Sequence, residues 1–336
     1  MFHSAANPVI RLVFIPLALL FYLISTGASL AVLSPIFVVM FMTIMPSRPP
    51  LSVLMKVMAA MLVISFGMVL FGSVLVDSPT GFWLYSWLLM YWGYSRSHRD
   101  PKDIIATLTL VVVVVMVVFN KQMNIQLGIL PLMLFEKLVV AIVVTYLGFW
   151  VFPGEDKDIL PEQGTSAADD TPMDSVVVVL KATALTIVLA VLIGMDASQT
   201  MLITITISNM IKSGNSHDHR TFSMNKLVTT TVGILFTLPI VLLVMAGAPD
   251  FVLFGVAVVC GLQLACFAIR RQTTLSIYQL LFTNFVALAY QILNHPGYDS
   301  LTAQLMRLLS ITCAIVIGAL ILSLIQSEKL VTAKQS

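Results

Sequence analysis

The sequence predicts an all-α polytopic membrane protein with about twelve transmembrane helices, arranged as two parallel six-helix repeats. Of its 336 residues, 59% are hydrophobic and only 10% are charged, and the mean hydropathy is +0.99. A soluble chain of this length needs far more polar surface. A second observation is that cations and one glycine recur about 170 positions apart. The recurring pairs are Arg11 and Lys181, Lys56 and Lys226, Lys137 and Arg307, and Gly148 and Gly318. Because charges are costly in a bilayer, this register predicts two equivalent halves around a shared centre, as in many transporters.

Apolar runs define the expected helices, since a crossing of the hydrocarbon core takes about 20 residues. In the first half we expect helices near residues 8–26, 28–46, 51–76, 80–94, 103–119 and 127–152. In the second half we expect them near residues 175–194, 197–212, 222–246, 250–269, 273–293 and 301–326. The runs 80–94 and 197–212 are short enough to be tilted or re-entrant, so about ten to twelve helices would span the membrane.

Turn residues separate these runs. The Pro-rich segment 46–50 ends the second run. Segments 77–81 and 247–250 combine Pro, Gly and Asp, and they divide the third run from the fourth in each half. Basic stretches follow the fourth run, from Arg96 to Lys102 and at Arg270-Arg271. Gly and Pro interrupt helices, so these segments mark boundaries between the runs. The boundaries occupy matching places in the two halves.

The distribution of basic residues predicts the orientation. With the N-terminus inside, the cytoplasmic segments hold twelve cations, namely Arg48, Lys56, Arg96, Arg99, Lys102, Lys212, Arg220, Lys226, Arg270, Arg271, Lys329 and Lys334. The opposite loops hold a single cation, Lys121. Their other charged residues are acidic, namely Asp77, Asp196, Asp250 and Asp299. The positive-inside rule therefore places both termini in the cytoplasm. An even number of helices per half makes the repeats parallel.

The domain organisation follows from these runs. Residues 1–152 form the first six-helix repeat and residues 175–326 the second, and residues 327–336 form a cytoplasmic tail. Residues 153–174 are rich in Asp, Glu, Gly, Pro and Ser, which predicts a flexible acidic cytoplasmic linker. This linker is too short to hold a folded soluble domain.

Enzymatic chemistry has little support in the sequence. The chain contains no phosphate-binding loop, no HExxH and no GxSxG motif, and its three cysteines show no metal or disulfide spacing. His217-Asp218-His219 comes nearest to a metal cluster. A solvated loop is the favoured interpretation, because a metal site usually needs a third or fourth ligand. We therefore expect no enzyme activity, no cofactor, no metal and no nucleic-acid partner.

The ionisable residues within apolar runs are the candidate site. Lys137 lies ten residues into its run, roughly 15 Å deep at 1.5 Å per residue, and Arg307 occupies the matching place. Such a pair would attract a carboxylate or phenolate across the two-fold centre, although each cation could instead pair structurally with a carboxylate or with helix-end carbonyls. Glu136 has no acidic counterpart in the second half, where Met306 occupies the matching position. A buried Glu can carry a proton, so Glu136 is the candidate for proton coupling, with an ion pair to another helix as the alternative. Neighbours at i and i+1 point in different directions, so Glu136 is not required to neutralise Lys137.

Two further cation pairs lie near the cytoplasmic helix ends. Arg11 with Lys181 and Lys56 with Lys226 could form a basic vestibule that draws in anions. The alternative is snorkelling to lipid phosphates, as most boundary lysines do.

The pattern resembles the fusaric acid resistance / aromatic acid exporter (FUSC-like) superfamily of bacterial inner-membrane permeases. The likeness rests on a cation in the first helix of each half, a basic residue opening the third helix, and a cation followed eleven residues later by glycine. The resemblance implies export of aromatic carboxylic acids or toxic compounds, driven by the proton motive force, with a periplasmic membrane-fusion adaptor as partner. The chain lacks the large cytoplasmic domains of the bigger members, so it is similar to a compact two-repeat branch.

The expected function is therefore an inner-membrane efflux permease for small organic anions, with a homo-oligomer as one alternative for its assembly. The competing hypothesis is a non-transporting membrane scaffold or assembly subunit of an envelope complex. A co-purifying adaptor would favour export, and the absence of a water-filled cavity between the halves would favour the scaffold. Normal export by Lys137→Ala and Arg307→Ala would exclude the central pair as the anion site.

Overall fold

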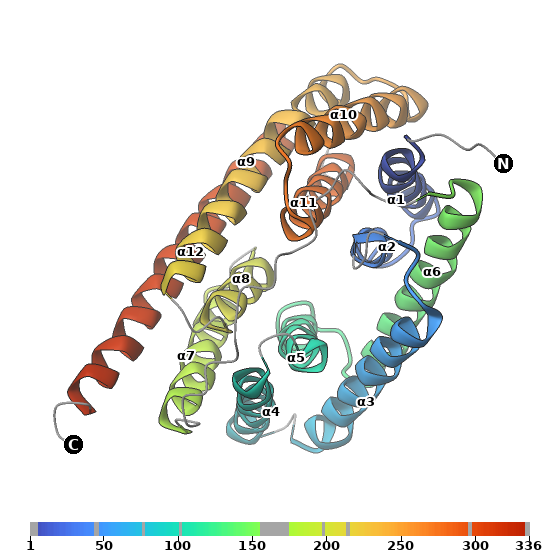
Figure 1. The fold of residues 1–336 in the computed structure, drawn as a ribbon. Coiled ribbons are helices and arrows are strands. Elements are labelled where there is room, and N and C mark those ends of the chain that lie inside the picture. The colour runs from blue at the N-terminus through green and yellow to red at the C-terminus, as the bar shows by residue number, and fades with distance from the viewer. Residues whose placement is uncertain are drawn as a thin grey trace. The chain divides into compact units, whose positions relative to one another are not determined.

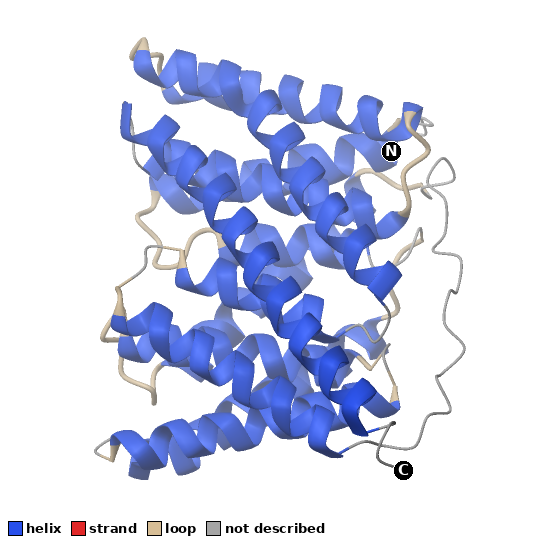
Figure 2. Ribbon diagram, turned by 90° about the vertical axis from the view of Figure 1, so that its left-hand side faces the viewer, coloured by secondary structure: helices blue, strands red, loops and turns tan. Residues whose placement is uncertain are grey.

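The computed structural model describes residues 6–43, 47–75, 78–100, 103–154, 175–196, 199–212, 216–294 and 298–332. Within them the chain forms twelve helices and no strand (Figures 1 and 2). The first six are α1 (Asn7–Ser25), α2 (Leu33–Thr43), α3 (Leu51–Leu75), α4 (Pro79–Arg99), α5 (Ile104–Lys121) and α6 (Leu130–Val151). The others are α7 (Ser175–Gly194), α8 (Thr200–Lys212), α9 (Ser216–Met245), α10 (Asp250–Arg270), α11 (Leu275–Asn294) and α12 (Tyr298–Thr332). The prediction of an all-helical chain is confirmed for these residues.

Eight of the described helices are long and apolar enough to cross a membrane. They are α1, α3, α6, α7, α10 and α11, together with Thr221–Met245 of α9 and Gln304–Ser323 of α12. Helices α4 and α8 are not among them, and α2 and residues Ile105–Lys121 of α5 are apolar but shorter. Length and composition therefore support a multi-pass membrane protein.

Local capping chemistry explains several helix starts. Ser78 precedes α4, and its hydroxyl oxygen accepts a hydrogen bond from the Gly81 N–H at 3.3 Å. Pro79 follows at a position where its missing N–H costs nothing. Asp103 caps α5 by accepting from the Ile105 N–H at 2.9 Å. Both side chains satisfy backbone donors that the first turn of a helix leaves free.

Some helix ends differ from the sequence prediction. Helix α4 continues to Arg99, five residues beyond the predicted end, because no breaker intervenes before Asp100-Pro101. Its last turn holds Arg96, His98 and Arg99, which interact favourably with the helix dipole. Helix α12 continues to Thr332 because residues 327–332 contain neither Gly nor Pro. Residues 155–174 of the predicted linker and residues 333–336 of the tail lie outside the described residues.

The chain divides into two compact units. Unit 1 comprises Met1–Leu54, Glu136–Gly164 and Asn225–Leu308, and unit 2 comprises Met55–Phe135, Thr165–Met224 and Leu309–Ser336. In unit 1, α1 packs on α2, α10 and α11, while α11 also packs on α2 and α10. In unit 2, α4 packs on α5, α7 and α8, while α5 and α7 also pack on each other and on α8. Helices α3, α6, α9 and α12 contribute residues to both units.

Candidate functional site

Arg11 is buried in unit 1, where it is 1% exposed. Its Nη1 donates hydrogen bonds to the backbone oxygens of Phe152 at 3.0 Å and Gly154 at 3.2 Å. The guanidinium carbon also lies 3.7 Å from the centre of the Phe149 ring. Helix C-terminal carbonyls lack intrahelical partners and carry negative partial charge. Arg11 therefore ties the start of α1 to the end of α6, and its predicted vestibule role stays a prediction.

Lys137 and Glu136 form an ion pair, with Lys137 Nζ 2.9 Å from Glu136 Oε1. The Lys137 side chain is 5% exposed, whereas that of Glu136 is 63% exposed. The expectation that i and i+1 neighbours would point apart is wrong here, because the long lysine chain reaches across to the adjacent carboxylate. The Lys137 backbone oxygen accepts a hydrogen bond from Ser34 Oγ of α2 at 3.1 Å. The predicted roles of Lys137 in anion binding and Glu136 in proton coupling are untested by these contacts.

The other cations differ in exposure. Lys181 in α7 of unit 2 is buried, and Lys56 lies exposed on α3. Arg307 in α12 of unit 1 is buried at 8% exposure. Lys226 in α9 of the same unit is half-buried. The side chains of His217, Asp218 and His219 lie outside the described part of the chain.

Lys226 and Arg307 are near enough for the charge of Arg307 to act on Lys226. Within the described residues neither cation has a carboxylate partner. Arg307 Nε is buried and makes no hydrogen bond to any described group. Two cations that interact inside apolar helices without an anion are costly, because they repel each other and have lost hydration. These two residues are the strongest candidate site of the protein.

Polar side chains follow Lys226 on α9 and are joined there by an amide of α11. Lys226, Thr229 and Thr230 lie on one face of α9, since residues three and four apart are neighbours on a helix. Asn284 of α11 is buried, and its Nδ2 donates to Thr229 Oγ1 at 3.3 Å and to Thr230 Oγ1 at 3.2 Å. The hydroxyls of both threonines donate to the Lys226 backbone oxygen. The face of α9 that carries Lys226 is thus held in place by a buried amide.

Gln304 is a candidate that the sequence prediction missed. It lies one turn before Arg307 in α12 and is 1% exposed. Neither Nε2 nor Oε1 of its amide has a hydrogen-bond partner among the described residues. A buried amide without partners costs roughly 1–3 kcal/mol, so it is better accommodated when a ligand occupies it. Its position near the start of an apolar run made Gln304 resemble an ordinary boundary residue.

The two repeated glycines lie where helices approach closely. A Cβ on Gly148 of α6 would come within 2.7 Å of Met42 and 3.3 Å of Ile15. A Cβ on Gly318 of α12 would come within 2.9 Å of the Met210 sulfur. Small residues allow such close packing between membrane helices. The recurrence that the sequence showed is therefore explained by packing within each unit.

The comparisons with known proteins give one partial likeness. A family described as "Protein of unknown function (DUF2955)" matches residues 8–148. The matched segment runs from α1 to near the end of α6, and it links this part of the chain to an uncharacterised family without conflict with the resemblance above. No curated protein and no solved structure matches the chain.

Proposed function

We propose that this protein is an efflux permease for small organic anions, such as aromatic carboxylic acids, and that Lys226 and Arg307 form its anion site. The observation that carries the proposal is the like-charged pair in α9 and α12, which has no carboxylate partner among the described residues. A bound carboxylate would offset one of the two positive charges and would give Arg307 Nε an acceptor. Intramembrane charges of this kind most often mark substrate pathways.

The residue types suit a carboxylate. The planar guanidinium of Arg307 can donate two parallel hydrogen bonds to one carboxylate, whereas Lys226 adds a point charge. Gln304 offers an amide donor one helical turn away. Because this amide is neutral, it would orient the anion without cancelling the positive charge that attracts it.

The proposal includes an architecture of twelve membrane helices in two interleaved repeats. A shift of 170 positions brings the starts of α1 to α6 within about five residues of the starts of α7 to α12. The packing supports the same equivalence, since α1 packs on α10 as α7 packs on α4, and α2 packs on α11 as α8 packs on α5. Each compact unit would then combine the first two helices of one repeat with the fourth and fifth of the other.

Helix ends within unit 1 support the proposed alternation across the membrane. The C-terminal ends of α1 and α11 and the N-terminal end of α10 line one pocket. The start of α1 contacts the end of α6 through Arg11. Both groupings fit helices that alternate in direction with the N-terminus in the cytoplasm. The bacterial inner membrane and a periplasmic membrane-fusion adaptor complete the proposal, and they derive from the charge pattern and the family resemblance.

Proton coupling is assigned to Glu136. Its carboxylate neutralises Lys137 inside α6, and protonation would release the charge of the lysine. A carboxylate paired with a cation in a membrane helix is a common element of proton relays. Transport and proton movement would therefore be linked through this ion pair, while the anion itself binds at Lys226 and Arg307.

The test is transport of labelled benzoate by purified protein in liposomes. Wild-type protein should exchange benzoate across the membrane. Arg307→Ala and Lys226→Ala should raise the benzoate concentration that gives half-maximal exchange by about 10- to 100-fold, as expected for losing one hydrogen-bonded charge. Lys56→Ala is the matched control, because Lys56 holds the register of Lys226 in the first half and is exposed. Exchange that is equally fast in wild-type and Arg307→Ala protein would contradict the site. Absence of any exchange in folded wild-type protein would favour the scaffold hypothesis.

A further inference from the structure

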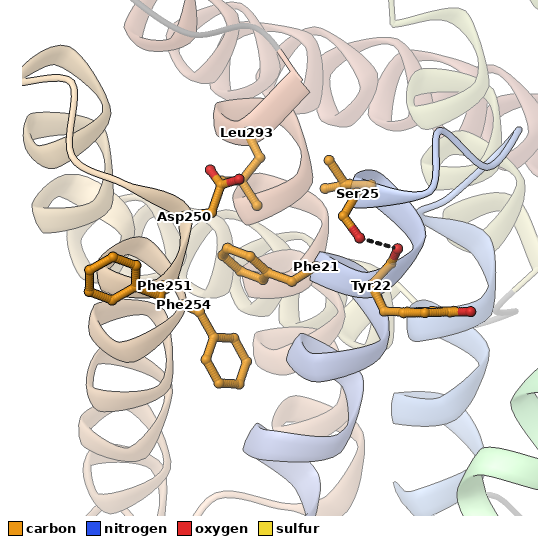
Figure 3. Close-up of a pocket in the computed structure, with 8 residues that line it drawn as sticks. Phe21, Tyr22, Ser25, Asp250, Phe251, Phe254 and Leu293 are labelled. Carbon is orange, nitrogen blue, oxygen red and sulfur yellow. Dashed lines mark hydrogen bonds between the residues drawn. The ribbon is translucent and has the colours of Figure 1, made fainter.

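A pocket of about 360 Å³ opens at one end of unit 1, and neither Lys226 nor Arg307 is among its lining residues. It lies between the C-terminal ends of α1 and α11 and the N-terminal end of α10 (Figure 3). The lining residues are Phe21, Tyr22, Ile24, Ser25, Asp250, Phe251, Phe254 and Leu293. The volume falls within the range of pockets that hold small molecules.

Aromatic rings form much of the pocket wall. Phe21 and Phe254 pack edge to face with ring centres 5.3 Å apart. Phe14, two turns earlier on the same face of α1, contacts the same ring of Phe254 with ring centres 5.6 Å apart. Figure 3 shows the ring of Phe21 directed between α1 and α10, with Asp250 nearby. The faces of aromatic rings carry negative charge density and attract cations.

The electrostatic character of the pocket is negative. Asp250 is the first residue of α10 and supplies a carboxylate. The C-terminal ends of α1 and α11 carry the negative ends of two helix dipoles, and the positive N-terminal end of α10 offsets them only in part. Neither helix has a basic residue in its last turn to offset this charge, and no cationic side chain is found among the described residues that line the pocket. A carboxylate, two helix C-termini and several rings thus act on one small space.

We propose that this pocket binds a small organic cation of the alkylammonium class. The ammonium group would lie against the rings of Phe21 and Phe254 with its charge facing Asp250. A carboxylate substrate would be repelled from the same space, so this site is separate from the one at Lys226 and Arg307. The ligand chemistry is shared by free alkylammonium compounds and by the headgroup of an amine-bearing phospholipid.

The matching positions of unit 2 lack these groups. A shift of 170 positions aligns Asp250 with Thr80, Phe251 with Gly81, Phe254 with Leu84 and Phe21 with Val191. Neither the carboxylate nor the rings recur there. The inferred cation site therefore belongs to unit 1 alone.

The experiment measures choline binding to the purified protein in a non-ionic detergent by titration calorimetry. The neutral isostere 3,3-dimethylbutan-1-ol has the same shape without the charge. We expect choline to bind at least about 10-fold more tightly than this alcohol, and Asp250→Asn to weaken choline binding by about 10-fold. Phe254→Leu should weaken it by about 3- to 10-fold. Asp196→Asn is the control, because Asp196 is an acidic residue of unit 2 that accepts a hydrogen bond from Gln122.

Equal binding of choline and the alcohol, no choline binding at all, or unchanged binding in Asp250→Asn would each overturn the proposal. A second arm assigns the source of the ligand. Choline binding is repeated in nanodiscs of phosphatidylglycerol alone and in nanodiscs that also contain phosphatidylethanolamine. Competition by phosphatidylethanolamine would identify a lipid headgroup as the occupant, and equal choline binding in both would identify a free cation.

Discussion

Lys137 and Arg307 hold the same register in α6 and α12, yet their charges are balanced differently. Lys137 has a carboxylate at the preceding residue, and the two groups pair at 2.9 Å. Arg307 follows Met306, and its charge acts on a second cation, Lys226. One half of the chain therefore holds a neutral pair, whereas the other holds excess positive charge.

Other residues at matched positions of the two halves also differ in polarity. The positions that match Asn284 and Gln304 are Val114 and Leu134, both buried and apolar. Alanines at 59 and 60 match Thr229 and Thr230. The common register is kept at the glycines where helices approach closely, but at these four matched positions polar side chains occur in the second half only. Under the proposed function, anion binding would belong to one half and charge neutralisation to the other.

The strongest test of this comparison makes the second half resemble the first. Met306→Glu places a carboxylate beside Arg307, as Glu136 stands beside Lys137. Met306 is 43% exposed, so the site accommodates a longer polar side chain. We expect benzoate binding to fall by about 100-fold because an internal anion competes with the ligand. Titration of labelled benzoate measures the effect, with Met306→Gln as the uncharged control. Equal affinities in the two variants would contradict the charge argument.

The reverse change removes the neutralising carboxylate of the first half. In Glu136→Gln we expect benzoate exchange to continue while uphill, proton-driven transport is lost, because the proposed proton carrier is gone. Exchange and pH-gradient-driven uptake in liposomes separate the two activities. Glu136→Asp should retain part of the coupling. Normal uphill transport by Glu136→Gln would exclude Glu136 as the proton carrier.

Arg11 offers a structural counterpart to these functional charges. Arg11→Ala removes two hydrogen bonds to the end of α6, and we expect it to destabilise the protein by about 2 kcal/mol, as for other charged hydrogen bonds. Thermal unfolding in detergent measures the loss. Arg11→Lys, which resembles Lys181 of the second half, should recover part of the stability. A wild-type melting temperature in Arg11→Ala would show that this contact contributes little.

The smallest effect is expected at the cap of α5. Burial raises the pKa of Asp103, but hydrogen bonds from Arg96 and from the Ile105 N–H outweigh it, so the pKa lies below its usual value. A lowered pKa stabilises the fold above the unfolded pKa, and this stabilisation is lost as the pH falls through the folded pKa. Asp103→Ala should cost about 1 kcal/mol at neutral pH and less in acid.

The control for this cap lies in the second half. Thr273 occupies the matching position before α11, and it has no acidic group. Thr273→Ala should therefore change the melting temperature by the same amount at neutral and acid pH. A pH-independent loss in Asp103→Ala as well would show that the charge of Asp103 is not what stabilises the cap.

Much of the fold was predictable because the bilayer imposes a local rule. A run of apolar residues bounded by Gly and Pro must form a helix that satisfies its own backbone, and each predicted run overlaps one of the twelve described helices. The candidate site was predictable only in part. Lys226 and Arg307 were evident as charges in apolar runs, but the sequence prediction placed them in different groups. Asn284 and Gln304 were missed, although an amide inside the apolar segment around Asn284 was a usable signal.

The sequence by itself determined the helices, their capping residues and the register of the repeated cations, since each depends on neighbours along the chain. Only the tertiary structure decided which charges meet, which amides stay without partners and which helix ends enclose the aromatic pocket. Membrane helices are apolar on nearly all sides, so hydrophobic periodicity does not reveal the face that a helix turns toward its neighbours. Small residues and specific polar contacts set that rotation, and they act between segments far apart in sequence, as Asn284 does with Thr229 and Thr230.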